Sequence, residues 1–179
     1  MHISACNVNC FLQNCKGECK RNREEFNAKI HELLLASEAL IPKTNLPDLP
    51  FMDLAPTVHE WYDFEHQLWA IGAEIRQLTI SENKDFGADH ADRICKICLD
   101  TRAKRGRQSF ILLLGKKKYS CYADRIISVL SDDDICGHVI NTVYKMGASQ
   151  YVKQIKPYTY HALTWIRNEA KRYVQKYSS

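Results

Sequence analysis

The sequence holds little of what marks a disordered chain, a membrane protein or a familiar enzyme. Its 179 residues include only 7 glycines and 5 prolines, and 45% of them are hydrophobic. That balance excludes a disordered tail or a collagen-like rod, and the length suffices for a buried core. No apolar run reaches about 18 residues, so no membrane span is expected. The lack of a Gly-rich phosphate loop, a GxSxG motif or a Cys–His pairing predicts a non-enzymatic protein.

The start of the chain also lacks the features of an export signal. Residues 1–20, MHISACNVNCFLQNCKGECK, have neither a positively charged start nor an apolar core. The eight cysteines are therefore expected in a reducing cytoplasm, where structural disulfides are rare. Their expected roles are packing, metal binding or redox chemistry.

Four of the cysteines fall close together near the N-terminus, at Cys6, Cys10, Cys15 and Cys19. Their thiolates converge on one zinc ion if the chain turns between Cys10 and Cys15. The three or four residues between successive cysteines exceed the two of a usual zinc knuckle. We predict a zinc site here. An iron–sulfur cluster, disulfides within a helical hairpin and free thiols remain as alternatives.

A second cysteine pair, Cys95 and Cys98, has the two-residue spacing of redox dithiols. Redox dithiols of that kind open a helix beside a sheet, whereas this pair lies inside an expected helix in a chain without predicted strands. We therefore interpret Cys95 and Cys98 as buried packing residues. Cys121 and Cys136 are interpreted in the same way.

Two long helical periods precede the C-terminal half. Residues 22–40 place apolar side chains about one turn apart, and residues 57–79 do the same, with Thr57 as the expected N-cap and Glu60 in the capping-box position. Between them, residues 41–56 hold four of the five prolines, which predicts a linker or an irregular packed loop.

Six shorter helical periods follow, in three pairs, and none shows the alternation of a strand. The chain is therefore predicted to be all-α. Three of the six periods share a pattern: residues 103–115, 135–147 and 166–178 begin 32 and 31 residues apart. Their closing glycines, Gly115 and Gly147, suit left-handed helix caps. The second and third copies agree column by column, and their apolar residues share one helix face: Ile135, Val139, Val143 and Met146 against Ile166, Ala170, Val174 and Tyr177.

Residues 88–179 resemble HEAT-type repeats of the short bacterial variety. In that family an Asp-rich turn leads into a helix that begins with an aliphatic residue and Arg and carries a small residue four positions on. SDDDICGHVINTVYKMG and TWIRNEAKRYVQKY have this form, although Cys136 departs from the Arg column and Arg107 takes a small-residue position. The resemblance implies about three helical hairpins in an α–α superhelix. A Cys-rich segment (1–21) and a helical cap (22–87) would precede them.

The resemblance also implies a concave binding face, lined by the second helix of each hairpin. The polar residues outside the apolar columns are then the candidate partner-binding residues: Lys104, Arg105, Gln108, Asn141, Lys145, Asn168, Lys171 and Arg172. The family's Arg typically pairs with an acidic residue of a neighbouring turn. Arg167 is therefore expected to pair with one of the aspartates at 132–134, and Asp100 to pair with Lys104 or Arg105.

Basic residues concentrate in one segment of a chain whose net charge is only +4. Residues 102–118 hold no acidic residue and seven basic ones: Arg102, Lys104, Arg105, Arg107, Lys116, Lys117 and Lys118. They are interpreted as solvated helix ends, with an anion-facing patch as the alternative. The leading prediction is a scaffold that binds a protein partner through its concave face. The alternatives are a nucleic-acid-binding protein, like the HEAT-like DNA alkylation-repair glycosylases, and a metal-binding sensor or enzyme built on the N-terminal cysteines.

Overall fold

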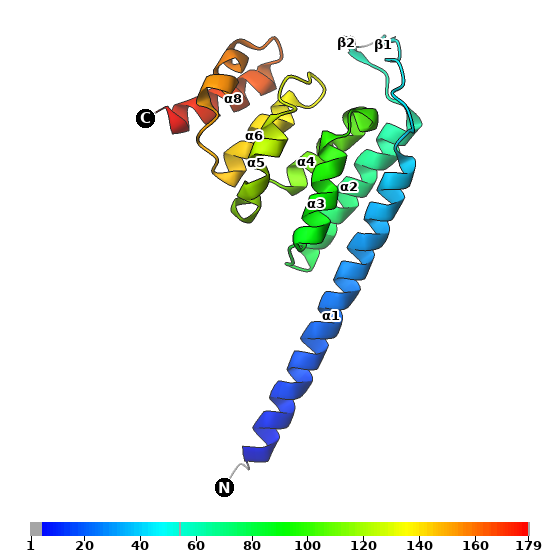
Figure 1. The fold of residues 1–179 in the computed structure, drawn as a ribbon, viewed down its shortest axis with the longest axis vertical. Coiled ribbons are helices and arrows are strands. Elements are labelled where there is room, and N and C mark those ends of the chain that lie inside the picture. Colours follow the sequence, from blue (N-terminus) through cyan, green and yellow to red (C-terminus); the bar gives the residue numbers. More distant parts are fainter. Residues whose placement is uncertain (1–4, 54, 179) are drawn as a thin grey trace.

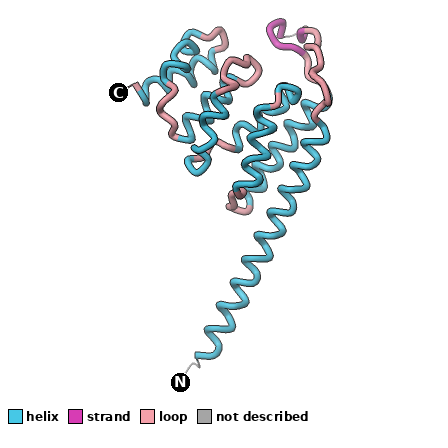
Figure 2. Tube along the Cα trace, viewed as in Figure 1, coloured by secondary structure: helices cyan, strands magenta, loops and turns pink. Residues whose placement is uncertain are grey.

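The computed structural model describes residues 5–53 and 55–178, which are mostly helical (Figures 1 and 2). The strands in this part of the chain are β1 (Phe51–Met52) and β2 (Ala55–His59), which pair antiparallel. The all-α prediction is confirmed. The helices, with η marking a 3-10 helix, are α1 (Ala5–Leu40), α2 (Asp63–Ser81), α3 (Ala88–Leu99), η1 (Thr101–Arg107), α4 (Gln108–Leu113), η2 (Lys117–Tyr122), α5 (Ala123–Ile127), α6 (Cys136–Met146), α7 (Val152–Ile155), η3 (Lys156–Tyr160) and α8 (Thr164–Tyr177).

The start of the second long helix was predicted too early. Residues 55–59 form β2, and α2 begins at Asp63, so Thr57 is not an N-cap. Pro56 disfavours helical angles at the residue before it, which helps to keep this segment extended. The N-terminal contact forms further along the chain instead, because the Tyr62 backbone N–H donates to the Glu65 carboxylate at 2.8 Å.

The helices pack side by side in two layers (Figure 1). In the first layer α1 contacts α3 and α3 contacts α5. In the second layer α2, α4, α6 and α8 contact one another in that order. Each second-layer helix also packs on the helix before it: α2 on α1, α4 on α3, α6 on α5, and α8 on α7 and η3. The N-terminal part of α1 extends past the other helices, away from the body of the molecule.

The apolar columns that the sequence pattern predicts face the core, although Val174 and Tyr177 are only partly buried. Ile135, Val139, Val143 and Met146 of the second copy are at most 2% exposed, and Ile166 and Ala170 of the third are at most 1% exposed. Gly147 has φ of 78° and forms the left-handed cap predicted for it. Gly115 does not have a positive φ, so the same prediction for Gly115 is wrong.

The described cysteines divide between core and surface. Cys95, Cys98 and Cys136 are buried, as predicted. Burial raises the pKa of the Cys95 and Cys136 thiols to about 11, so neither is poised as a thiolate. Cys121 is exposed, so its interpretation as a packing residue is wrong. Within the described ranges, no helix combines the length and the apolar character needed to cross a membrane.

Candidate functional site

The basic run at 102–118 is largely neutralised within the protein. Six of its seven members form ion pairs: Arg102 with Asp100, Lys104 with Asp48, Arg105 with Glu65, Arg107 with Asp132, and both Lys116 and Lys118 with Asp85. A nucleic acid would have to compete with these carboxylates for the same cations. The run therefore gives little support to an anion-binding patch.

Arg107 is an internal cross-link between two hairpins. Its side chain is 1% exposed and pairs with Asp132 in the turn before α6. Its Nε donates to the Lys104 carbonyl at 3.0 Å and its Nη1 to the Cys98 carbonyl at 3.3 Å. This partnering explains how a guanidinium stands at a small-residue position of the repeat, because a buried charge is tolerated when its donors are satisfied.

Arg105 joins the start of α2 to η1. Its backbone N–H donates to the Glu65 carboxylate at 2.9 Å, and its Nη1 donates to the His59 carbonyl at 2.6 Å. The guanidinium also lies over the Trp61 ring, 4.9 Å from its centroid. The Arg105 side chain is 8% exposed, so it is part of the architecture and offers little surface to a partner. We refer to Glu65, Arg105, Arg107 and Asp132 as the turn network.

The side chains beside the turn network are also engaged. Lys104 pairs with Asp48 at 2.7 Å, and its φ of 44° is unusual for a residue with a side chain. Gln108 donates to the Asp134 carbonyl at 2.7 Å. Three of the eight candidate partner-binding residues, Lys104, Arg105 and Gln108, thus hold neighbouring segments together.

A groove crosses all four helices of the second layer. It consists of two adjoining hollows, each of about 270 Å³, which share Arg76, Leu112 and Lys145. The first hollow is also lined by Gly137, His138, Asn141, Trp165 and Glu169. The second is also lined by Thr79, Ile80, Phe86, Leu113, Gly115 and Lys116. Together these residues define the groove.

Some charged side chains of the groove have a partner of opposite charge and others do not. The Glu169 carboxylate accepts from Asn141 Nδ2 at 2.9 Å and pairs with Arg172 at the rim. No ion pair involving Arg76 or Lys145 is found among the residues whose side chains are described. Burial, followed by the charge of nearby Arg76, lowers the pKa of Lys145. The shared part of the groove therefore carries a local excess of positive charge.

Two polar atoms in the groove wall are buried without a hydrogen-bond partner. They are Nδ1 of His138 and Oδ1 of Asn141, and both side chains line the first hollow. Burial lowers the pKa of His138 to about 4, so its ring is neutral at pH 7. Unsatisfied buried polar atoms are uncommon in native proteins, and neither atom is exposed to solvent, so this pair is a candidate contact for a ligand that shifts the wall of the first hollow.

Trp165 lies beside these polar groups, and a second exposed tryptophan, Trp69, lies on α2. Trp165 is 46% exposed and packs against the start of α6, where a Cβ on Gly137 would come within 2.2 Å of the indole ring. The ring also meets His138 edge-on, with centroids 5.1 Å apart. Trp69 is 44% exposed and precedes Arg76 on α2 by seven residues, which places both on the same side of that helix.

The candidate residues of α6 and α8 are placed unequally with respect to the groove. Asn141 and Lys145 line it, and Arg172 reaches its rim through Glu169. Asn168 and Lys171 are exposed, but Lys171 follows Trp165 by six residues and therefore points about 120° away from it around α8.

Sequence reasoning missed Arg76, His138, Trp165 and Glu169. Of these, the last three lie outside the apolar columns and could have been included on that ground.

Two ion pairs expected from the repeat pattern take other partners. Arg167 does not pair with an aspartate of the preceding turn: it donates to the carbonyls of His161 and Ala162, at 2.5 and 3.1 Å, and to Thr164 Oγ1 at 3.0 Å. Asp132 pairs with Arg107 instead. Asp100 pairs with Arg102, two residues away, and not with Lys104 or Arg105.

The zinc prediction at Cys6, Cys10, Cys15 and Cys19 concerns side chains outside the described part of the structure. Helix α1 runs from Ala5 to Leu40 and passes through all four positions without the turn on which their convergence depends. The metal prediction for these cysteines stays a prediction.

Comparisons of the chain with known proteins do not assign it to a family. No protein-family model matches the chain, and no curated protein or solved structure matches it either.

Proposed function

We propose that this chain is a non-enzymatic helical-repeat protein that binds an acidic, extended segment of a protein partner in the groove. One observation carries the proposal: among the described side chains, buried His138 Nδ1 and Asn141 Oδ1 have no hydrogen-bond partner, and they lie beside Arg76 and Lys145, which form no ion pair there. A peptide with acidic side chains supplies hydrogen-bond partners for the two polar atoms and negative charge for the two cations.

The two-layer packing supports a HEAT-like superhelix as the scaffold. The sequence repeat at 135–147 and 166–178 coincides with α6 and α8, which are neighbours in the second layer. In a stack of such hairpins each unit contacts mainly its neighbours, so the exposed side of one layer becomes a continuous surface. The groove lies on that layer and takes residues from each of its helices.

The dimensions suit an extended peptide. Packed helix axes lie about 8–10 Å apart, so a groove across four helices is roughly 25–30 Å long. An extended chain covers that length with about eight residues. Its backbone N–H groups are donors for Asn141 Oδ1, and its acidic side chains meet Arg76 and Lys145. An apolar or aromatic side chain of the peptide would pack on Trp165.

Charge favours a protein partner over a nucleic acid. Glu169 lies in the groove beside Trp165, where it would repel a continuous phosphate backbone, whereas a peptide can place its carboxylates at Arg76 and Lys145 and an uncharged residue beside Glu169. The basic run that favoured nucleic acid is paired internally. A base of a nucleic acid could still stack on Trp165. Measuring the binding of an oligonucleotide in the same experiment tests this interaction.

The experiment measures fluorescence anisotropy with a set of labelled acidic octapeptides, each carrying one aromatic residue, and with their lysine-containing counterparts. We expect the acidic set to bind selectively. Lys145→Glu should weaken binding at least tenfold, about 1.4 kcal/mol, because it reverses a charge inside the groove. Lys171→Glu makes the same charge change on the outer side of α8 and should alter affinity less than about twofold.

Three outcomes would contradict the proposal. The first is no binding of any acidic peptide at low salt, and the second is an equal loss of affinity in Lys145→Glu and Lys171→Glu. The third is tighter binding of a labelled single-stranded oligonucleotide, with steep salt dependence and loss in Lys145→Glu, which would assign the groove to nucleic acid.

A further inference from the structure

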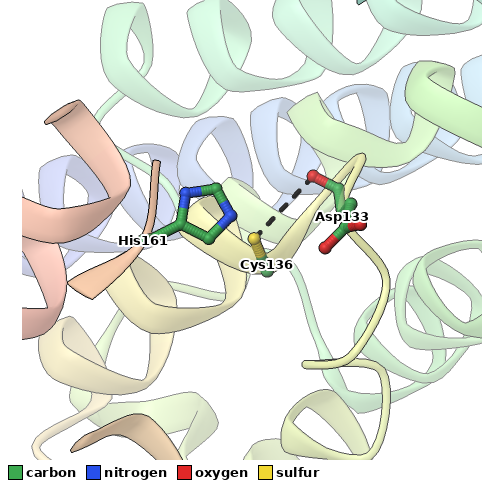
Figure 3. A group of neighbouring side chains, drawn as sticks. All are labelled: Asp133, Cys136 and His161. Carbon is green, nitrogen blue, oxygen red and sulfur yellow. Dashed lines mark hydrogen bonds between the residues drawn. The ribbon is translucent and has the colours of Figure 1, made fainter. Parts of the chain in front are cut away.

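Asp133, Cys136 and His161 come together where the turns of two neighbouring hairpins meet (Figure 3). Asp133 lies in the turn before α6, Cys136 is the first residue of α6, and His161 follows η3 just before α8. One oxygen, one sulfur and one nitrogen from these side chains lie within 4.8 Å of one another. A carboxylate, a thiolate and an imidazole are the three side-chain ligands that zinc most often uses.

Local contacts hold Cys136 and the backbone of Asp133 in place. The Cys136 thiol donates to the Asp133 carbonyl at 3.7 Å, and the Cys136 backbone N–H donates to the Asp132 carbonyl at 2.8 Å. Asp132 is itself held by Arg107. The turn before α6 folds back so that the Asp133 carboxylate and the Cys136 sulfur lie within 4.8 Å of each other.

The imidazole is held separately, from the next hairpin. The Leu163 backbone N–H donates to His161 Nδ1 at 3.1 Å, and Arg167 donates to the His161 carbonyl at 2.5 Å. The ring stacks on Tyr158, with centroids 6.1 Å apart, and the Tyr158 hydroxyl donates to the Leu130 carbonyl at 2.7 Å. Two independently anchored turns thus place their ligands opposite each other.

We propose that Asp133, Cys136 and His161 form a zinc site that links the turn of the α5–α6 hairpin to the turn of the last hairpin. Zinc would displace the thiol proton to solvent and bind the sulfur as thiolate. Tetrahedral ligands at bond lengths of about 2.0–2.3 Å lie roughly 3.3–3.6 Å apart, so the ligand atoms need to close by about 1 Å. Asp133 is exposed in its turn and is free to make that movement. Three protein ligands leave the fourth position to water.

Metal binding has a local signature at Leu163. If Nδ1 of His161 binds zinc, its lone pair is no longer available to the Leu163 N–H. If the other nitrogen, Nε2, binds, the neutral ring carries its proton on Nδ1, which then cannot accept. In either case the present bond from Leu163 is broken.

The test uses the full chain with Cys6, Cys10, Cys15, Cys19 and Cys121 all replaced by serine, so that no other exposed or N-terminal thiol contributes. Cobalt added to this protein should bind in a one-to-one ratio. It should give a thiolate-to-cobalt charge-transfer band and the visible bands of a tetrahedral ion, and zinc should abolish both. Cys136→Ser should remove the charge-transfer band.

Two further variants keep the test decisive if Cys136→Ser does not fold, because their side chains are less buried. Asp133→Asn and His161→Gln should each weaken cobalt binding at least tenfold, while His66→Gln, an exposed histidine on α2, should leave it unchanged. In amide hydrogen exchange, zinc should speed exchange at Leu163.

The proposal is overturned if the five-serine protein gives no thiolate band, if the band survives in Cys136→Ser, or if His66→Gln weakens binding as much as His161→Gln. An unchanged Leu163 amide in the zinc-loaded protein would remove His161 from the ligand set.

Discussion

The turn network and the groove both contain basic side chains, but the basic side chains of the turn network form ion pairs, whereas Arg76 and Lys145 of the groove do not. In the turn network Arg107 is 1% exposed, and two carbonyls and the Asp132 carboxylate accept from its guanidinium. In the groove Arg76 and Lys145 make no described ion pair, and two buried polar atoms have no partner. Internally satisfied charges stabilise the arrangement of the hairpins, whereas an unmatched set is what a ligand can complete.

Removing Arg107 should have the largest effect. Arg107→Ala leaves the Lys104 and Cys98 carbonyls and the Asp132 carboxylate without their donor and opens a cavity. We expect urea denaturation to show a loss of about 3–5 kcal/mol in the free energy of unfolding. Arg102→Ala removes the ion pair with Asp100 from the same basic run. Because the Arg102 side chain is 41% exposed, this change should lower the free energy of unfolding by less than about 1 kcal/mol. Equal losses in the two variants would show that the turn network is no more important than a surface pair.

Adding a methyl group at Gly137 should destabilise the packing of the groove helices α6 and α8 more than it affects the turn network. Gly137→Ala places its Cβ against the Trp165 ring and should destabilise the protein by about 1–3 kcal/mol, because α6 and α8 are forced apart. In a Trp165→Ala background the loss should become smaller, because the contact with the indole ring is gone and only Ile166 Cγ1, 2.9 Å from the added Cβ, still has to shift. An undiminished loss in that background would place the strain elsewhere.

The neutral state of His138 predicts a pH dependence of stability that arises mainly from the groove. Its folded pKa of about 4 lies below the ordinary 6.5, so the unfolded chain binds more protons between these values and stability falls as the pH is lowered. Going from pH 7 to pH 5.5 should cost about 1 kcal/mol, measured by urea denaturation at both pH values.

His138→Gln should remove most of this slope. A smaller residual slope is expected from His90, whose pKa burial also lowers. The carboxylates of Asp48, Asp85 and Asp100 have pKa values lowered by hydrogen bonds from basic partners, so their contribution is lost only below about pH 4. A wild-type slope retained in full by His138→Gln would contradict the buried, neutral assignment.

The smallest expected effect comes from comparing two lysines. Lys145→Met should leave stability unchanged or raise it by up to about 0.5 kcal/mol, because burial and Arg76 both disfavour the charged form in the folded protein. Lys104→Met removes the ion pair with Asp48 and should lower stability by about 0.2–1 kcal/mol. Thermal and urea unfolding of both variants measures the difference, and a larger loss in Lys145→Met would refute the unmatched state of the groove.

Local patterns located the helices well and their first residues less well. The six C-terminal periods correspond to the observed hairpins because apolar spacing along one helix face is a local property that burial then uses. The start of α2 was misplaced, since a glutamate stands three residues after Thr57, at Glu60, and also three residues after Tyr62, at Glu65, where the helix truly begins. Pairing of β1 with β2 keeps the segment around Thr57 extended, so the helix begins near Tyr62. The backbone hydrogen bonds of this strand pair leave no signal in helical periodicity.

The sequence by itself determined the helical class, the apolar columns at Ile135 and Ile166 and the burial of Cys95 and Cys98, because each depends on spacing along one segment. Only the tertiary structure decided the role of each basic residue. Arg105 became an internal cross-link and Lys145 a groove residue according to whether each forms an ion pair with a described carboxylate from a distant segment. The same applies to Asp133, Cys136 and His161, since ligand convergence depends on the packing of neighbouring hairpins and leaves no trace in local periodicity.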